Sequence, residues 1–107
     1  MASAHLKGSL DLLVMSVLRD APAHGYAIIT ALRDRSAGEF DLAEGTIYPA
    51  LHKLEAAGFV RSRWDTASGR RRRVYALTGR GEREFATQRA DWLGFVRGMH
   101  AVVGGAA

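Results

Sequence analysis

The stretch FVRSRWDTASGRRRRVYALT, residues 59–78, is the part of the sequence that decides the predicted fold. Two strand-like runs, Phe59–Trp64 and Arg72–Leu77, flank the turn-rich segment Asp65–Gly69, which predicts a β-hairpin. Alternation along the second strand places Arg71 and Arg73 on one face with Tyr75. It places Arg70 and Arg72 on the opposite face, so the hairpin carries cations on both sides of its tip.

Three amphipathic helices are expected before the hairpin, over residues 6–19, 24–35 and about 41–57. The third has the spacing Asp41-x-x-Glu44, which fits a capping box, and Gly58 is expected to end it. Pro49 lies inside this helix and predicts a bent or irregular start, because proline removes a backbone donor.

A long helix over about Gly79–Val103 follows, with Thr78 as its N-cap. Three short helices, a hairpin and a final long helix predict a winged helix-turn-helix, mainly α with a small β-hairpin (α+β). We therefore expect a DNA-binding domain at residues 1–78. Residues 79–107 are then a C-terminal dimerisation helix with a short flexible tail, and the two parts form one compact unit.

The composition narrows the class of function. The formal charge is +4, and among the 15 Lys and Arg residues only Lys7 and Lys53 are lysines, which favours bidentate contact with phosphate or guanine. There is no cysteine, and neither GxxxxGK nor GxSxG occurs, so an enzyme is not expected and no cofactor is required. No segment has the length of a membrane span, and we expect a soluble cytoplasmic protein.

The third helix would lie in the major groove of double-stranded DNA. Its inward face uses Ile47, Leu51 and Leu54, which leaves Gly45, Thr46, Tyr48, Pro49, His52 and Lys53 outward. An ordinary solvated face is the alternative for the helix alone. Eight cationic side chains between residues 61 and 83, opposed only by Asp65 and Glu82, favour nucleic-acid binding. A basic structural protein that binds nucleic acid without sequence preference remains the rival interpretation.

Three stretches resemble the PadR family of bacterial transcriptional regulators: HGYAIITAL (24–32), EGTIYPALHKLEAAGFV (44–60) and GRRRRVYALTGRGERE (69–84). The resemblance implies a winged-helix repressor that binds a palindromic operator as a homodimer. It assigns base recognition to Thr46, Tyr48, Pro49 and His52, the wing to Arg70–Arg73, and a phosphate contact to Tyr26. Ala43 departs from the capping Ser, Thr or Asn common in relatives, which affects where the recognition helix begins.

The last helix has an apolar stripe close to a heptad seam, widened by Phe95 and Val102; its members are Phe85, Trp92, Val96, Met99 and Val103. The small domain cannot cover such a stripe, so a homodimer is expected.

A single C-terminal helix resembles the short class of PadR-like proteins. In some of these regulators, a tryptophan matching Trp92 stacks flat aromatic compounds at the dimer centre. This implies a small-molecule effector site at Trp92, Phe95, Val96 and Met99, although plain packing of Trp92 in the interface is the favoured interpretation. A divalent metal effector would rest on two weak candidates, His5 and His100. Whether the wing arginines contact a groove or the backbone stays open.

Overall fold

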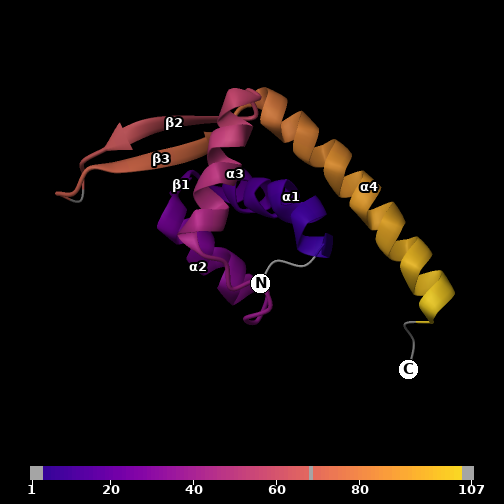
Figure 1. The fold of residues 1–107 in the computed structure, drawn as a ribbon. Coiled ribbons are helices and arrows are strands. Elements are labelled where there is room, and N and C mark those ends of the chain that lie inside the picture. The colour runs from indigo at the N-terminus through magenta and orange to yellow at the C-terminus, as the bar shows by residue number, and fades with distance from the viewer. Residues whose placement is uncertain (1–3, 68, 105–107) are drawn as a thin grey trace.

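The computed structural model describes residues 4–67 and 69–104, with side chains from Gly8 onward. Four helices and a small antiparallel sheet form the winged helix that the sequence predicts (Figure 1). Ser68, which belongs to the predicted hairpin turn, lies outside the described residues, and so does the side chain of His5, a candidate metal ligand. The elements, in chain order, are α1 (Ala4–Asp20), β1 (Ala23–His24), α2 (Gly25–Arg35), α3 (Glu44–Ala56), β2 (Val60–Asp65), β3 (Arg72–Leu77) and α4 (Gly79–Val103).

The core lies where α1 packs against α2, α3 and the base of the sheet. Helical spacing on α1 and α3 turns one apolar face of each helix inward, and Tyr75 of β3 closes the cluster from the sheet. The largest fully buried side chains are Val14, Met15, Ile28, Ile47, Leu51, Leu54, Val60 and Tyr75. In Figure 1 the hairpin and α4 extend from this body on opposite sides.

The sheet has the order β1-β3-β2, and both pairs are antiparallel. The hairpin register sets Val60 opposite Leu77 and Asp65 opposite Arg72, in agreement with the predicted wing. The two-residue strand β1 was not predicted. It pairs His24 with Val74 of β3, which brings the start of α2 against the wing.

The predicted capping box of α3 is wrong. The helix begins at Glu44, and its N-cap is therefore Ala43, whose methyl group accepts no hydrogen bond. The helix is continuous through Pro49, because the carbonyl that loses its partner belongs to exposed Gly45 and can be hydrated.

Gly58 ends α3 as the sequence predicts. Its φ of +82° lies in the left-handed region, where glycine has no Cβ penalty. The Gly58 N–H donates to the Glu55 carbonyl at 3.0 Å, and the Phe59 N–H donates to the Leu54 carbonyl at 3.0 Å. These two bonds form a Schellman motif, which turns the chain directly into β2.

Thr78 caps α4, as predicted: its Oγ1 accepts from the Gly81 N–H at 3.0 Å. The same hydroxyl donates to the Gly58 carbonyl at 2.7 Å. One side chain thus starts the last helix and ties it to the corner between α3 and β2.

Candidate nucleic-acid interface

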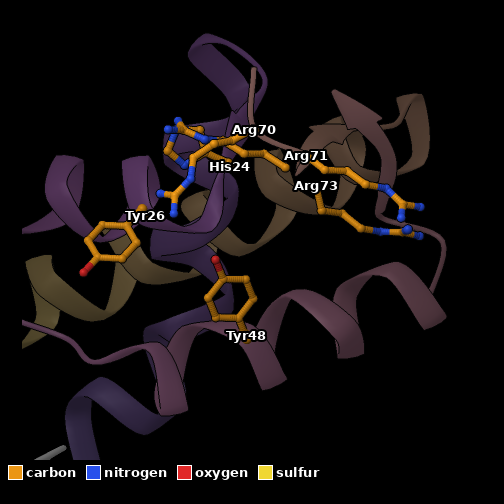
Figure 2. A pocket seen from close by; sticks show the side chains of 7 residues that line it. His24, Tyr26, Tyr48, Arg70, Arg71 and Arg73 are labelled. Carbon is orange, nitrogen blue, oxygen red and sulfur yellow. The ribbon is translucent and has the colours of Figure 1, made fainter. Parts of the chain in front are cut away.

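A cleft of about 570 Å³ opens between the wing, α2 and α3. All of its lining residues that the structure describes can donate hydrogen bonds or carry positive charge (Figure 2). These are His24, Tyr26, Tyr48 and Arg70–Arg73. Six of the predicted DNA-binding residues therefore meet at a single site: Arg70–Arg73 of the wing, Tyr26 of α2 and Tyr48 of α3. His24, which was not predicted to bind DNA, lies at the same site.

Local structure explains why the two tyrosines reach the cleft. Gly25 is buried at the first position of α2, and a Cβ at Gly25 would lie only 2.4 Å from the Tyr48 Cζ. The Tyr48 ring thus rests directly on the α2 backbone. Tyr26 follows Gly25 and is 61% exposed, so its ring stands at the open side of the cleft.

The Tyr48 hydroxyl is held in its neutral form. Burial raises the pKa of Tyr48 above the ordinary value of 10.0, and the nearby Glu44 carboxylate and Tyr26 phenol raise it further. A neutral phenol donates a hydrogen bond, which suits it to an anionic oxygen such as that of a phosphate group.

The wing arginines divide between two faces, as strand alternation predicts. Figure 2 shows Arg71 and Arg73 extending together, away from the tyrosines. Their guanidinium carbons lie 4.1 Å and 5.0 Å from the ring centroid of Trp64. Trp64 is half exposed, so it lies on the surface of the hairpin and does not belong to the core. Its ring is a platform on which two cations stack.

A hydrogen-bonded chain joins this platform to α3. The Arg73 Nε donates to the Ser62 Oγ at 2.9 Å, and the Ser62 Oγ donates to Glu55 Oε2 at 2.6 Å. The carboxylate near the end of α3 thereby holds the wing through one serine. We call Glu55, Ser62 and Arg73 the wing tether.

The outward face of α3 is open to solvent where base reading is predicted. Gly45, Pro49, His52 and Lys53 are exposed, and Thr46 is half-buried. Lys53 also pairs with Asp11 of α1 at 3.2 Å, a surface ion pair of small energetic value that leaves its ammonium accessible.

The far part of α4 carries the apolar stripe into solvent. Trp92 is 45% exposed and Phe95 60%, and Val96, Met99 and Val103 are exposed as well. A shallow groove of about 320 Å³ on this stripe is lined by Phe95, Val96, Met99, His100 and Val103, and Trp92 is outside it.

Phe85 differs from its predicted place in the dimer seam. Its side chain belongs to the monomer core, with 7% exposed, because the first turns of α4 pack against α1. The guanidinium of Arg19 lies 5.4 Å from its ring centroid and covers it.

Comparison with known proteins identifies the family. The model of the transcriptional regulator PadR-like family matches residues 14–87. The chain belongs to this family. It is 33% identical to the transcriptional regulator Rv3488 of Mycobacterium tuberculosis over 70% of this chain and 67% of that protein.

Solved structures show the same fold. A PadR family transcription regulator from Clostridium difficile is 32% identical, with a TM-score of 0.78 over 91% of this chain and all of that one. A transcriptional regulator from Clostridium thermocellum has a TM-score of 0.86 at 23% identity, over 94% and 96% of the two chains.

The PadR-like match spans the whole cleft and ends in the first turns of α4, so the exposed stripe of α4 lies beyond the matched residues. The family is one of transcriptional regulators and not of enzymes, which agrees with the prediction. In the part of the PadR-like chain that the structure describes, no helix has the length and hydropathy to span a bilayer. The same part contains no cluster of three or more histidine or carboxylate side chains that could bind a metal ion.

Sequence reasoning missed two features of this PadR-like site: the contact of His24 with Arg72, and the wing tether. Residues 24 and 72 are 48 positions apart, and only the pairing of β1 with β3 brings them together. The sequence did contain one signal that could have drawn attention to His24: the motif HGY places it directly before α2.

Proposed function

We propose that this PadR-like regulator is a repressor that binds a palindromic operator as a homodimer. In this proposal α3 reads base edges through Gly45, Thr46, Pro49, His52 and Lys53. Tyr48, whose phenol lies in the cleft, joins Tyr26 and Arg70–Arg73 in gripping the DNA backbone. The observation that carries the proposal is the cleft, where donors from three elements converge beside the exposed face of α3.

The division between reading and grip follows from the chemistry of each group. Side chains on the outward face of a helix in the major groove reach base edges, which carry the sequence information. Guanidinium and phenol groups beside that helix suit phosphate oxygens, which fix the position of the protein on the duplex. Arg71 and Arg73 both lie over the Trp64 ring, so these two wing arginines are held on the face of the hairpin away from the tyrosines.

The exposed stripe of α4 supports a dimer. Trp92, Phe95, Val96 and Met99 form a row on a helix of 25 residues that leaves the body of the monomer. Apolar surface of this extent favours burial against a second copy. Two recognition helices in such a dimer would address half-sites about 34–36 Å apart, one DNA turn.

An effector at the dimer centre would act by changing that separation. A ligand shifts operator affinity only if it binds one arrangement of the subunits better than the other. The groove lined by Phe95, Val96 and Met99 is apolar, which favours a planar aromatic compound over a metal ion. A thermal-shift screen of planar aromatics and divalent metals on wild type, on Phe95→Ala, which removes a lining side chain of the groove, and on Trp92→Ala, which tests stacking at the dimer centre, tests this. Stabilisation that disappears in either variant supports the pocket, and stabilisation by none of the compounds contradicts it.

The DNA function is tested by comparing the duplex upstream of the protein's own gene with random DNA at physiological salt. A specific regulator binds its site about 10³–10⁷-fold more tightly than random sequence. Equal affinities would favour the basic structural protein instead. Thr46→Ala is expected to reduce the preference for the operator over random DNA. Arg71→Gln is expected to weaken binding to both duplexes by the same factor.

The dimer is tested by sedimentation. Val96→Glu places a charge in the stripe, so we expect the variant to be monomeric at concentrations where the wild type is dimeric. Ala86→Glu, an exposed position on the same helix outside the stripe, is the matched control. A wild type that stays monomeric at all concentrations would contradict the proposal.

A further inference from the structure

His24 has two neighbours that compete for one acceptor. Its Nδ1 lies 3.3 Å from the Ala27 backbone nitrogen and caps α2. Its Nε2 lies 2.9 Å from Nη1 of Arg72 on the wing. The backbone N–H and the guanidinium are both donors, and neither can accept.

A neutral imidazole carries one acceptor nitrogen and one N–H group. If Nδ1 accepts from Ala27, the proton sits on Nε2 and points at the Arg72 guanidinium, donor against donor. If Nε2 accepts from Arg72, the proton sits on Nδ1 and the helix loses its side-chain cap. A protonated ring has no acceptor for either partner. His24 therefore cannot satisfy both neighbours without a third group.

An anionic oxygen beside Nε2 and Nη1 resolves the conflict, once the flexible Arg72 side chain opens its 2.9 Å contact with Nε2. It would accept from both donors at once, and the Nδ1 lone pair would remain for the cap of α2. We propose that a phosphate oxygen binds at this point, in the cleft between the wing and the start of α2. The proposal rests on the proposed function only for the source of that phosphate, a phosphodiester of the DNA backbone.

The surroundings favour an oxyanion. The same cleft is lined by Tyr26, Tyr48 and Arg70, and none of the lining residues that the structure describes is a carboxylate. The first backbone N–H groups of the 11-residue helix α2 add positive potential at its N-terminus. Arg71 and Arg73 are engaged with Trp64 on the other face, so Arg72 is the wing arginine that contacts α2.

The tautomer of His24 reports directly on whether a phosphate oxygen occupies the proposed site. Long-range ¹H–¹⁵N correlation spectra of the imidazole distinguish a proton on Nδ1 from one on Nε2. One arm adds the upstream duplex; the other replaces sodium chloride by sodium phosphate at equal ionic strength. We expect a shift to the Nε2–H form together with stronger hydrogen-exchange protection of the Ala27 amide.

The two arms identify the source. A shift with duplex and none with inorganic phosphate assigns the site to a backbone phosphodiester. A shift with inorganic phosphate alone assigns it to free phosphate, and a shift with both shows that the site takes either. An unchanged His24 in both arms overturns the proposal. If wild type binds its duplex specifically while His24 is unchanged, only this inference fails. If the duplex binds no better than random DNA, the proposed function fails, and the phosphate arm still tests the site.

Two variants separate the phosphate contact from the helix cap. His24→Ser keeps a side-chain acceptor for the cap but removes the donor, so we expect an unchanged melting temperature and roughly tenfold weaker DNA binding per subunit. Arg72→Gln should lower the slope of log K against log salt concentration by about 0.9. Because both groups hold one oxygen, the double variant should lose less affinity than the sum of the two. Arg97→Gln, an exposed arginine of α4, is the control. A His24→Ser protein that melts as the wild type does and binds DNA equally well would contradict the contact.

Discussion

Replacement of Gly25 by alanine tests how α3 is seated against α2. The new Cβ would lie 2.4 Å from Cζ, 2.5 Å from Oη and 2.8 Å from Cε1 of Tyr48. Carbon atoms in contact prefer about 3.5–4.0 Å, so the ring must retreat by roughly 1 Å or leave the cleft. Gly25 is helical, its φ is not positive, and the three atoms nearest to the new Cβ all belong to the Tyr48 ring, so the clash with that ring is the main steric objection to alanine.

The magnitude follows from two opposing effects. Overpacking costs about 1–3 kcal/mol, and the better helix propensity of alanine returns up to about 1 kcal/mol. We therefore expect Gly25→Ala to lower the free energy of unfolding by about 1–2 kcal/mol, measured by urea denaturation at one fixed protein concentration. DNA affinity should fall as well, because the Tyr48 phenol is displaced, although residue 25 itself offers no side chain to DNA.

A double-mutant cycle decides whether the ring is the cause. In a Tyr48→Ala background the clash is gone, so Gly25→Ala should be neutral or stabilising by up to about 1 kcal/mol. The coupling energy between the two sites should then be about 1–3 kcal/mol. Gly94→Ala, where a Cβ meets only the far end of Arg97 at 3.8 Å, is the control for helix propensity. An equal cost of Gly25→Ala in both backgrounds would refute the reasoning.

Three further predictions concern stability and the wing. Gly81→Ala sets a Cβ 1.9 Å from the Phe59 carbonyl oxygen, a backbone atom, so we expect a loss of at least about 2 kcal/mol in urea denaturation; a wild-type midpoint would contradict it. Ser62→Ala breaks the wing tether, so we expect about 1 kcal/mol of destabilisation and faster amide exchange in β2 and β3; unchanged exchange would show that the tether does not hold the wing. Burial raises the pKa of Tyr75 above 10.0, so the unfolded chain ionises first and the free energy of unfolding should decline as pH rises above about 10. Tyr75→Phe should lack this part of the decline, and an identical decline in the variant would exclude Tyr75 as its origin.

Features with local signals could be predicted from the sequence. Thr78 as the start of α4 and Gly58 as the end of α3 depend on side chains and dihedral angles within a few residues. The hairpin and the two faces of its arginines depend on alternation along one strand. The capping box failed although its spacing was present, because Asp41 lies two residues before the N-cap and cannot serve the first helical turn.

Features that depend on distant pairing could not be predicted. Strand β1 has two residues and no pattern of its own, yet it brings His24 to Arg72. The wing tether likewise needs the register of β2 against β3. Phe85 shows a further limit of periodicity, because an apolar position on α4 can be buried by α1 of the same chain or by a second copy. Only the tertiary packing distinguishes the two.

The pairing of β1 with β3 also gives His24 three structural tasks at once. It ends β1 opposite Val74, caps α2 and contacts Arg72 of the wing. A force on the wing therefore reaches the first turn of α2, where Gly25 supports the Tyr48 ring of α3. If the proposed function holds, β1 is the shortest structural connection between the wing and the helix proposed to read bases. A change in the position of the wing on DNA would then be expected to alter how Tyr48 of α3 is seated on α2.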